Sequence, residues 1–257
     1  MSEAGSLIRS LSGRLAARNF HSYVINDIGV GIVSGRFPVG SILPNDAAMM
    51  GEYGVSRTVL REALKTLEAK GLVEARPKVG TRVLPRNRWN LFDAQVLSWH
   101  FEAEPDLQFL ESLYDTRLAL ELRAADLAAR HRNSDHIRLL KYWAHQMEMS
   151  FDTPEPFALA ELEFHRIIAE ASANPFLRSI GGIVELAMTL TMSAASGDAE
   201  GERGWRSAGY EQHHQLALAI EASDPETACA SISGIIQSGL DTARAGLKSR
   251  RAPGEKP

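Results

Sequence analysis

Apolar residues recur every three or four positions along most of this chain, a spacing typical of α-helices with one buried side. The longest run of such helices lies between residues 105 and 249. The spans expected there are 106–131, 134–150, 154–172, 175–195, 210–222 and 225–248, with a glycine-rich loop at 197–204. No strand-like alternation interrupts them, so the pattern predicts an all-α antiparallel helical bundle.

The N-terminal third has a different order of elements. A helix at 22–34 is followed by a short helix at 46–53, and Gly54 can adopt the positive φ of a sharp turn between helices. Ser56 is a suitable N-cap for the next helix. The apolar stripe of that helix consists of Leu60, Ala63, Leu64 and Leu67, and its other face carries Arg57, Thr58, Arg61 and Lys65. We therefore expect the exposed face to be cationic.

A β-hairpin is expected directly after this helix. Gly71 ends the helix where a left-handed residue is usual, and apolar pairs at 72–73 and 83–84 flank a basic tip at 76–80. This order predicts a winged helix-turn-helix, whose second helix enters the major groove of DNA while the hairpin reaches phosphates or the neighbouring minor groove. The chain as a whole is expected to be mainly α.

The chain divides into four expected segments. These are a winged helix-turn-helix head at 1–86, a linker with a docking helix at 87–104, the bundle at 105–249 and a disordered tail at 250–257. Residues 1–88 hold 13 Lys and Arg against 7 Asp and Glu, a charge of +6, whereas the remainder carries −10. Attraction to phosphates should therefore reside in the head, and the acidic remainder should stay off the duplex.

Composition excludes several other classes of protein. The apolar share of 44% is ordinary for a globular chain, and no run of about 18 apolar residues predicts a membrane span. Cys229 is the only cysteine, which excludes an internal disulfide and a thiolate zinc cluster. The start of the chain lacks the features of a secretion signal, so we expect a cytoplasmic location.

Contacts with DNA are expected from the cationic helix and the hairpin. The candidates are Ser56, Arg57, Thr58, Arg61, Lys78 and Gly80. The two arginines suit bases, because arginine can bond O6 and N7 of guanine together, whereas the hydroxyl groups suit phosphates and the hairpin residues suit the approach to the groove. A symmetric dimer would read a short palindrome, since a single head buries too little surface for specificity.

The stretch from Leu43 to Val83 resembles the DNA-binding domain of the GntR family of bacterial transcription regulators. It contains, in order, LP, a short helix, GVSR, V-x-REAL, GLV and G-T-x-V. The bundle resembles the FCD effector domain of the FadR subfamily, and the linker PRNRWNLFDAQVLSW resembles that of the D-galactonate operon repressor group. Ala47 departs from the pattern, because the fatty-acid-responsive relative has a basic residue there, so the operator need not be the same.

Arg117 and Glu121 stand four residues apart on an expected helix. Such a pair can be a weak ion pair on the surface. In FCD domains, however, the arginine of this pattern points into the bundle, where a guanidinium can grip a carboxylate through two hydrogen bonds. The resemblance makes Arg117 the expected anchor of the effector. Trp205, in the expected loop, could close over a ligand or fill the bundle.

Glu161, His165 and His213 are candidates for effector or metal binding. Glu161 and His165 can face the same side of one helix, and in the FCD metal-binding pattern an aspartate stands in place of Glu161. The pattern also places a histidine where this chain has Ile235. Three ligands could still hold a divalent ion such as Zn²⁺, completed by water or effector oxygens. Alternatively, the same side chains could form hydrogen bonds directly with the hydroxyl and carboxylate groups of a small acid.

The sequence therefore predicts a homodimeric, DNA-binding transcription regulator rather than an enzyme. We expect a repressor of an operon for a sugar acid, such as an aldonate, or another small carboxylate, released from its operator when the effector binds in the bundle. An acyl-CoA effector is the alternative within the family, although the polar residues would be an unusual lining for an acyl chain. A metal-dependent hydrolase using Glu161, His165 and His213 is the alternative of another class, but it would need no cationic winged head.

Overall fold

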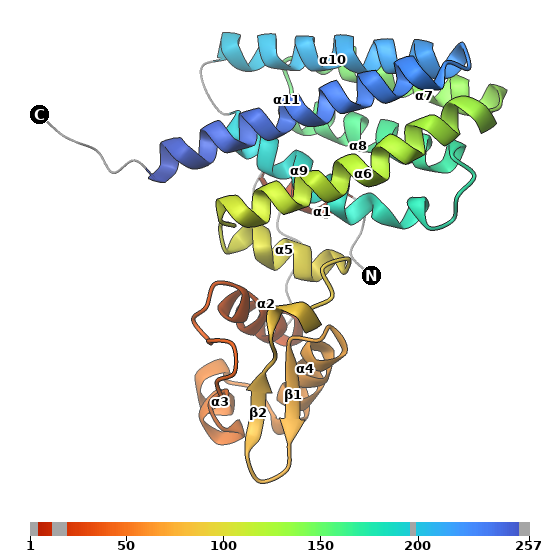
Figure 1. Cartoon of the computed structure of the whole chain (residues 1–257). Helices are drawn as coiled ribbons and strands as arrows, with labels where there is room; N and C mark the ends of the chain where they lie inside the picture. The colour runs from red at the N-terminus through yellow and green to blue at the C-terminus, as the bar shows by residue number, and fades with distance from the viewer. Residues whose placement is uncertain (1–4, 12–19, 196–198, 252–257) are drawn as a thin grey trace, which may run out of the picture. The chain divides into compact units, whose positions relative to one another are not determined.

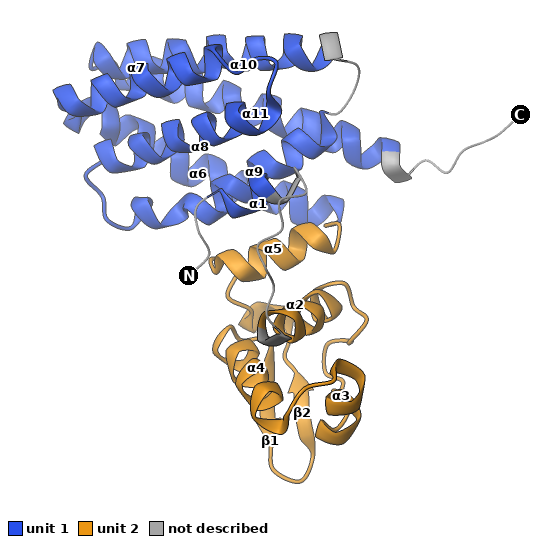
Figure 2. Cartoon of the chain, turned by 180° about the vertical axis from the view of Figure 1, so that it is seen from behind, with its two compact units in different colours: residues 1, 3–14, 106–257 blue, residues 2, 15–105 orange. Residues whose placement is uncertain are grey.

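The computed structural model describes residues 5–11, 20–195 and 199–251, and these form two compact units. The head unit contains the described residues of Leu15–Pro105, and the bundle unit contains those of Glu3–Arg14 and Asp106–Pro257 (Figure 2). Within the described ranges, no helix combines the length and the apolar character needed to cross a membrane.

The head unit has the predicted winged helix-turn-helix order. Its elements are α2 (Phe20–Val33), α3 (Asp46–Tyr53), α4 (Arg57–Ala69), β1 (Val73–Arg76), β2 (Gly80–Val83), the 3-10 helix η1 (Arg86–Arg88) and α5 (Ala94–Glu102) (Figure 1). Gly54 ends α3 with a φ of 63°, and the Ser56 hydroxyl accepts a hydrogen bond from the amide of Val59. Both ends of the turn between α3 and α4 are thus fixed by the residues that the sequence indicated.

The wing is an antiparallel hairpin in which Val73 pairs with Val83 and Arg76 pairs with Gly80. A third chain segment extends it, because the amide of Leu43 donates to the carbonyl of Thr81 at 2.8 Å. At the tip, Lys78 and Gly80 have φ angles of 63° and 113°. These conformations turn the chain within a few residues and leave the tip exposed.

The core of the head unit is formed between α2, α4 and α5. Ile28 and Ile32 of α2 are fully or almost fully buried with Leu60 and Leu67 of α4. Trp99 of α5 joins this core with 0% exposure, and its indole nitrogen donates to the side chain of Asn26 at 3.0 Å. Helix α5 is therefore an integral part of the head unit.

Helix α5 begins at Ala94, inside the segment 87–104 that was expected to contain a linker and a docking helix. The reason is Asp93, whose carboxylate accepts hydrogen bonds from the amides of Gln95 and Val96 and so caps the helix.

The bundle unit consists almost entirely of helices, as predicted. They are α1 (Ser6–Leu11), α6 (Leu107–His131), α7 (Ser134–Glu148), α8 (Pro154–Ala171), the 3-10 helix η2 (Leu177–Ile180), α9 (Gly181–Ala194), α10 (Ala199–Glu221) and α11 (Pro225–Arg251). Helix α11 packs against α6, α9 and α10, while α7 packs against α8 and α10 (Figure 1).

The prediction of a glycine-rich loop at 197–204 is wrong for those of its residues that the structure describes. Helix α10 already begins at Ala199, so Trp205 is helical rather than part of a loop. Arg206 donates from Nε to the carbonyl oxygen of Phe151 at 2.6 Å, and Arg203 pairs with Asp152 at 3.1 Å. These bonds to the α7–α8 connection hold the first turns of α10 in place, although their glycines disfavour a helix.

Two other boundaries also differ from the expected ones. The helix expected at 175–195 begins only at Gly181, because the Asn174 side chain accepts from the amide of Phe176 and forms a turn first. Helix α11 continues to Arg251, so the first residues of the expected tail are helical. The rest of that tail lies outside the described residues.

Helix α1 belongs to the bundle unit, although residues 1–86 were expected to form the head. Ile8 has no exposed surface and packs in a cluster that includes Ala158 and Val184. The amide of Leu7 donates to the carboxylate of Glu185 at 2.7 Å. Burial raises the pKa of Glu185, and bonds from the amides of α1 partly offset that rise. The start and the C-terminal part of the chain therefore share one core.

Candidate functional site

The cationic face of α4 is exposed. Ser56, Arg57, Thr58 and Arg61 are all on the surface of the head unit, while the apolar stripe of the same helix faces the core. Among the described residues, neither Arg57 nor Arg61 forms an ion pair with a carboxylate of the chain. Lys65, by contrast, pairs with Glu62 at 2.9 Å. The two arginines therefore remain available for an external partner.

A groove of about 630 Å³ runs between α4 and the hairpin. Arg57, Thr58 and Arg61 line it from the helix, and Thr81 lines it from β2. Lys78 and Gly80 lie at the exposed wing tip and the adjoining end of β2. The head unit thus carries all six candidate DNA contacts on the exposed parts of two neighbouring elements.

The C-terminal end of α4 is bonded to the start of α5. Lys70 donates to both carboxylate oxygens of Asp93, at 2.6 and 2.7 Å, and Asp93 is also the cap of α5. The chain passes so close here that a Cβ on Gly71 would lie 2.1 Å from the carbonyl oxygen of Arg88. Sequence reasoning missed this pair, because its two members lie in elements whose packing is not visible in local patterns.

In the bundle unit, a buried polar cluster joins helices α6, α8 and α10. Arg117 donates from Nε to Glu121 at 3.0 Å, and the other oxygen of Glu121 lies 2.9 Å from Nδ1 of His165. Nη2 of Arg117 and Nε2 of His213 approach Nε2 of His165 at 3.2 and 3.3 Å. With 2% exposure, Arg117 forms a buried ion pair and not the alternative surface pair.

The hydrogen bonds assign the tautomers of both imidazoles. His165 donates from Nδ1 to the carboxylate of Glu121, so its Nε2 accepts from Arg117. Nδ1 of His213 lies 2.7 Å from the carbonyl oxygen of Gly209, which can only accept, so Nδ1 carries the proton. The two Nε2 atoms lie 3.3 Å apart, and Nε2 of His213 lies 3.6 Å from the carboxylate of Glu161.

Burial and charge separate the pKa values in this cluster. Burial alone would raise the pKa of Glu121, but Arg117 and His165 outweigh it and hold that pKa at about 2. Burial lowers the pKa of His213 to about 3, with a further contribution from His165. Burial raises the pKa of Glu161, although His165 and Arg117 act in the opposite direction. At neutral pH the cluster contains a charged Arg117–Glu121 pair and a neutral His213.

The donor set of Glu161, His165 and His213 fits a divalent ion. One ligand atom from each lies within 4.8 Å of the others. Two imidazole lone pairs and a carboxylate are a common three-ligand set, and Glu121 and Gly209 orient the two rings from behind. Ile235 lines a cavity together with Glu161 and His213, but its side chain has no atom that could coordinate a metal.

The polar cluster borders a cavity of about 70 Å³, here called the inner cavity. Arg117, Glu161 and His213 line it, and Phe157, Trp205 and Ile235 form apolar parts of its wall. Sequence reasoning missed three further polar lining residues, which are Thr191, Gln212 and Ser238. Ser238 follows Ile235 by one helical turn, so helical spacing could have revealed it.

An exposed cationic helix with a wing, together with a helical bundle that encloses a polar cavity, defines a ligand-responsive DNA-binding regulator. Family models agree with this class. The gntR family of bacterial regulatory proteins matches residues 23–83, and the FCD domain matches residues 112–238.

The chain belongs to the GntR family of transcription regulators, in the FadR-like subfamily with an FCD domain. It is 36% identical over 174 residues to the uncharacterized HTH-type transcriptional regulator YieP of Escherichia coli, covering 66% of this chain and 75% of that one. It is 29% identical over 157 residues to the galactonate operon transcriptional repressor of Escherichia coli, covering 61% and 69%. Its identity to the repressor NanR of Salmonella typhimurium is 29% over 226 residues, covering 87% and 84%.

Solved structures share the fold. Lar of Listeria monocytogenes superposes with a TM-score of 0.63 at 17% identity, covering 90% of this chain and 99% of that one. McbR/YncC of Escherichia coli superposes with a TM-score of 0.51 at 18% identity, covering 88% and 98%.

Proposed function

We propose that this regulator represses an operon for the catabolism of a sugar acid or another small carboxylate, and that the effector releases it from its operator. The observation that carries the proposal is Arg117, a buried guanidinium on the wall of a cavity with hydroxyl, amide and imidazole groups. That lining suits a carboxylate with several hydroxyl groups. Similarity to the galactonate operon transcriptional repressor supports an operon for a sugar acid.

On the operator, Arg57 and Arg61 read bases in the major groove. Ser56 and Thr58, at the N-terminus of α4, contact phosphates, and the wing around Lys78 and Gly80 approaches the adjoining groove. Two heads of a homodimer read the two halves of a palindrome. The exposure of these side chains supports this assignment.

In the bundle, the carboxylate of the effector binds Arg117. Its hydroxyl groups bond to Glu161, His213 and the other polar residues that line the inner cavity, and to His165 in the polar cluster behind them. Trp205 contacts the effector from the wall of the cavity. The effector shifts the equilibrium toward the arrangement that does not bind DNA, by the difference between its affinities for the two arrangements.

A divalent ion such as Zn²⁺ could be held by Glu161, His165 and His213. When bound, it would supply a Lewis acid for effector oxygens. His165 would then coordinate through the Nε2 atom that now accepts from Arg117, and Nη2 of Arg117 would be available to the effector carboxylate.

Neither alternative function fits the structure as well. The inner cavity is lined by polar and charged groups, among them Arg117, Glu161 and Gln212, which are poor neighbours for an acyl chain, and this disfavours acyl-CoA as the effector. A hydrolase built on Glu161, His165 and His213 would leave the exposed cationic head without a role.

The test is a mobility-shift titration on the DNA upstream of the gene, with and without sugar acids. We expect one acid to release the DNA. The Arg117→Ala variant should bind DNA as the wild type does but should not respond to that acid. Arg123→Ala is the matched control, because Arg123 lies on the same helix but is exposed. Calorimetry showing unchanged affinity of Arg117→Ala for the acid would remove Arg117 from the site.

A further inference from the structure

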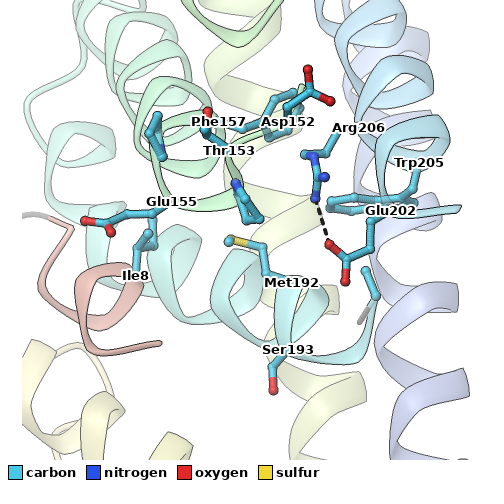
Figure 3. Close-up of a pocket in the computed structure, with 13 residues that line it drawn as sticks. Ile8, Asp152, Thr153, Glu155, Phe157, Met192, Ser193, Glu202, Trp205 and Arg206 are labelled. Carbon is cyan, nitrogen blue, oxygen red and sulfur yellow. Dashed lines mark hydrogen bonds and ion pairs between the residues drawn. The ribbon is translucent and has the colours of Figure 1, made fainter. Parts of the chain in front are cut away.

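The bundle unit contains a second pocket, which is larger than the inner cavity and differs from it in chemistry. Its volume is about 530 Å³, and it is here called the outer pocket. Its walls come from α1, the start of α8, the end of α9 and the first turns of α10 (Figure 3). Phe157 and Trp205 line both spaces, but Arg117 and the other members of the polar cluster are not among the described residues that line the outer pocket. A ligand in the outer pocket would therefore lie apart from the buried guanidinium.

Apolar side chains reach the outer pocket from each of these helices. They are Ile8, Pro154, Pro156, Phe157, Met192, Ala195 and Trp205. The rings of Phe157 and Trp205 lie 6.5 Å apart between centroids and are tilted by 53°. Figure 3 shows the side chains of Met192 and Trp205 directed into the pocket. Aromatic rings and thioethers both make favourable contacts with a further aromatic ring, so the lining suits an aromatic ligand.

The charged groups of the outer pocket are already engaged within the chain. Asp152 pairs with Arg203 at 3.1 Å, and Arg206 pairs with Glu202 at 3.3 Å. Glu155 has a partner as well. A charged ligand would thus meet no unpaired counterion among the described lining residues, but it would lose the hydration of its own charge. These ion pairs therefore favour an uncharged ligand.

The volume of the outer pocket sets the size of that ligand. An engineered cavity of about 150 Å³ holds one benzene molecule. A pocket of about 530 Å³ lies within the usual range of small-molecule sites, roughly 300–1,000 Å³. It has room for about two or three aromatic rings.

We propose that the outer pocket is a second small-molecule site of this regulator, which binds an uncharged aromatic compound of two or three rings. The compound packs against Phe157, Met192 and Trp205, and it makes no contact with Arg117. The bundle thus has two sites that differ in the chemistry of their ligands. This inference does not rest on the proposed function, because it uses neither the polar cluster nor the DNA-binding head.

Fluorescence titration of the full-length wild-type chain with N-phenylnaphthylamine tests the proposal. This uncharged probe has three aromatic rings and emits strongly only in apolar surroundings. Anilinonaphthalenesulfonate is the matched comparison, because it has the same rings and one added sulfonate group. We expect one saturable site per chain for the uncharged probe, with a dissociation constant at least tenfold lower than that for the sulfonate. The absence of a saturable site, or equal affinities for the two probes, would overturn the proposal.

Variants of the two methionines locate the bound probe. Met192→Trp fills the outer pocket and should weaken the uncharged probe at least tenfold, whereas Met192→Leu should bind it as the wild type does. Met149→Trp is the matched control, because Met149 is 70% exposed and does not line the pocket, and it should leave the affinity unchanged. Unchanged affinity in Met192→Trp would place the probe elsewhere and overturn the assignment.

The Arg117→Ala variant separates the outer pocket from the inner cavity. It should bind the uncharged probe with the affinity of the wild type, because Arg117 lines only the inner cavity. A tenfold loss of affinity would place the probe in the inner cavity and overturn the proposal. The comparison of the two probes uses the wild type, so it does not depend on the folding of any variant.

Discussion

At the scale of single residues, Glu121 organises the buried polar cluster of the bundle unit. It bonds Arg117 on its own helix and His165 on α8. The first bond was predictable, because a spacing of four residues brings two side chains together on a helix. The second was not, because it depends on how α6 packs against α8. Sequence spacing also cannot distinguish a buried ion pair from an exposed one, and here the pair is buried.

Glu121→Gln should therefore destabilise the bundle unit. The substitution leaves the charge of Arg117 buried without its counterion, which costs about 3 kcal/mol in comparable buried pairs. We expect a clearly lower urea midpoint for the bundle than in the wild type. Glu163→Gln is the control, because Glu163 pairs with Arg166 near the surface, and it should change the free energy of unfolding by less than about 1 kcal/mol. Equal effects would show that the pair at Glu121 is not buried in solution.

Arg61→Ala should weaken operator binding by about 1–3 kcal/mol and relax the preference at one base pair. The reason is the loss of paired hydrogen bonds to a base edge. Mobility shifts on a set of operators that differ at single positions measure both effects. Lys65→Ala, one turn further along α4, should weaken all operators alike. Uniform weakening by Arg61→Ala would mean that Arg61 contacts a phosphate.

At the scale of elements, the helical pattern predicted the main helices. The largest error occurred where contacts with residues far away in the sequence determine whether a segment is helical. The glycines before Trp205 favoured a loop, yet Arg206 reaches the carbonyl oxygen of Phe151, 55 residues away in sequence, and holds a helix there. By contrast, the start of α5 at Ala94 is decided locally, by the cap residue Asp93. The sequence before a helix includes the residue that caps it, but it does not show which of several neighbouring polar residues will be the cap.

Packing between α2 and α5 should not tolerate a side chain at Gly29. A Cβ there would lie 2.4 Å from the ring of Trp99, which has no exposed surface. Gly29→Ala should lower the stability of the head unit by about 1–3 kcal/mol, as other overpacked cores do. Gly51→Ala in α3 is the matched control, since a Cβ there meets nothing within 4 Å, and it should be neutral or stabilising by up to about 1 kcal/mol. Thermal unfolding compares the two variants.

At the scale of the whole molecule, the sequence predicted the fold class and the family because several features occur in a fixed order. It also showed a head of charge +6 and a remainder of charge −10. It did not predict that α1 packs with the bundle, because the six residues of that helix carry too little pattern to indicate their partner. The polar cluster was predicted in its members but not in the connections between them.

DNA binding should weaken steeply with salt, because phosphate contacts release counterions. Lys78→Ala should reduce the slope of log K against log salt by about 1 without changing the preference among operators. Lys141→Ala is the control, since Lys141 lies on the bundle and pairs with Glu221, and it should leave the slope unchanged. Titrations at four salt concentrations measure the slopes. A change of slope in the control would assign DNA contacts to the bundle.

The packing of α1 in the bundle unit makes the head an insertion within the bundle's own chain. The polypeptide crosses from bundle to head after α1 and returns between α5 and α6. Ile8 of α1 is buried in the bundle beside Ala158 and Val184. Removing the residues that precede the head would therefore also remove part of the core of the bundle, even though a truncation at that point would leave the head itself intact.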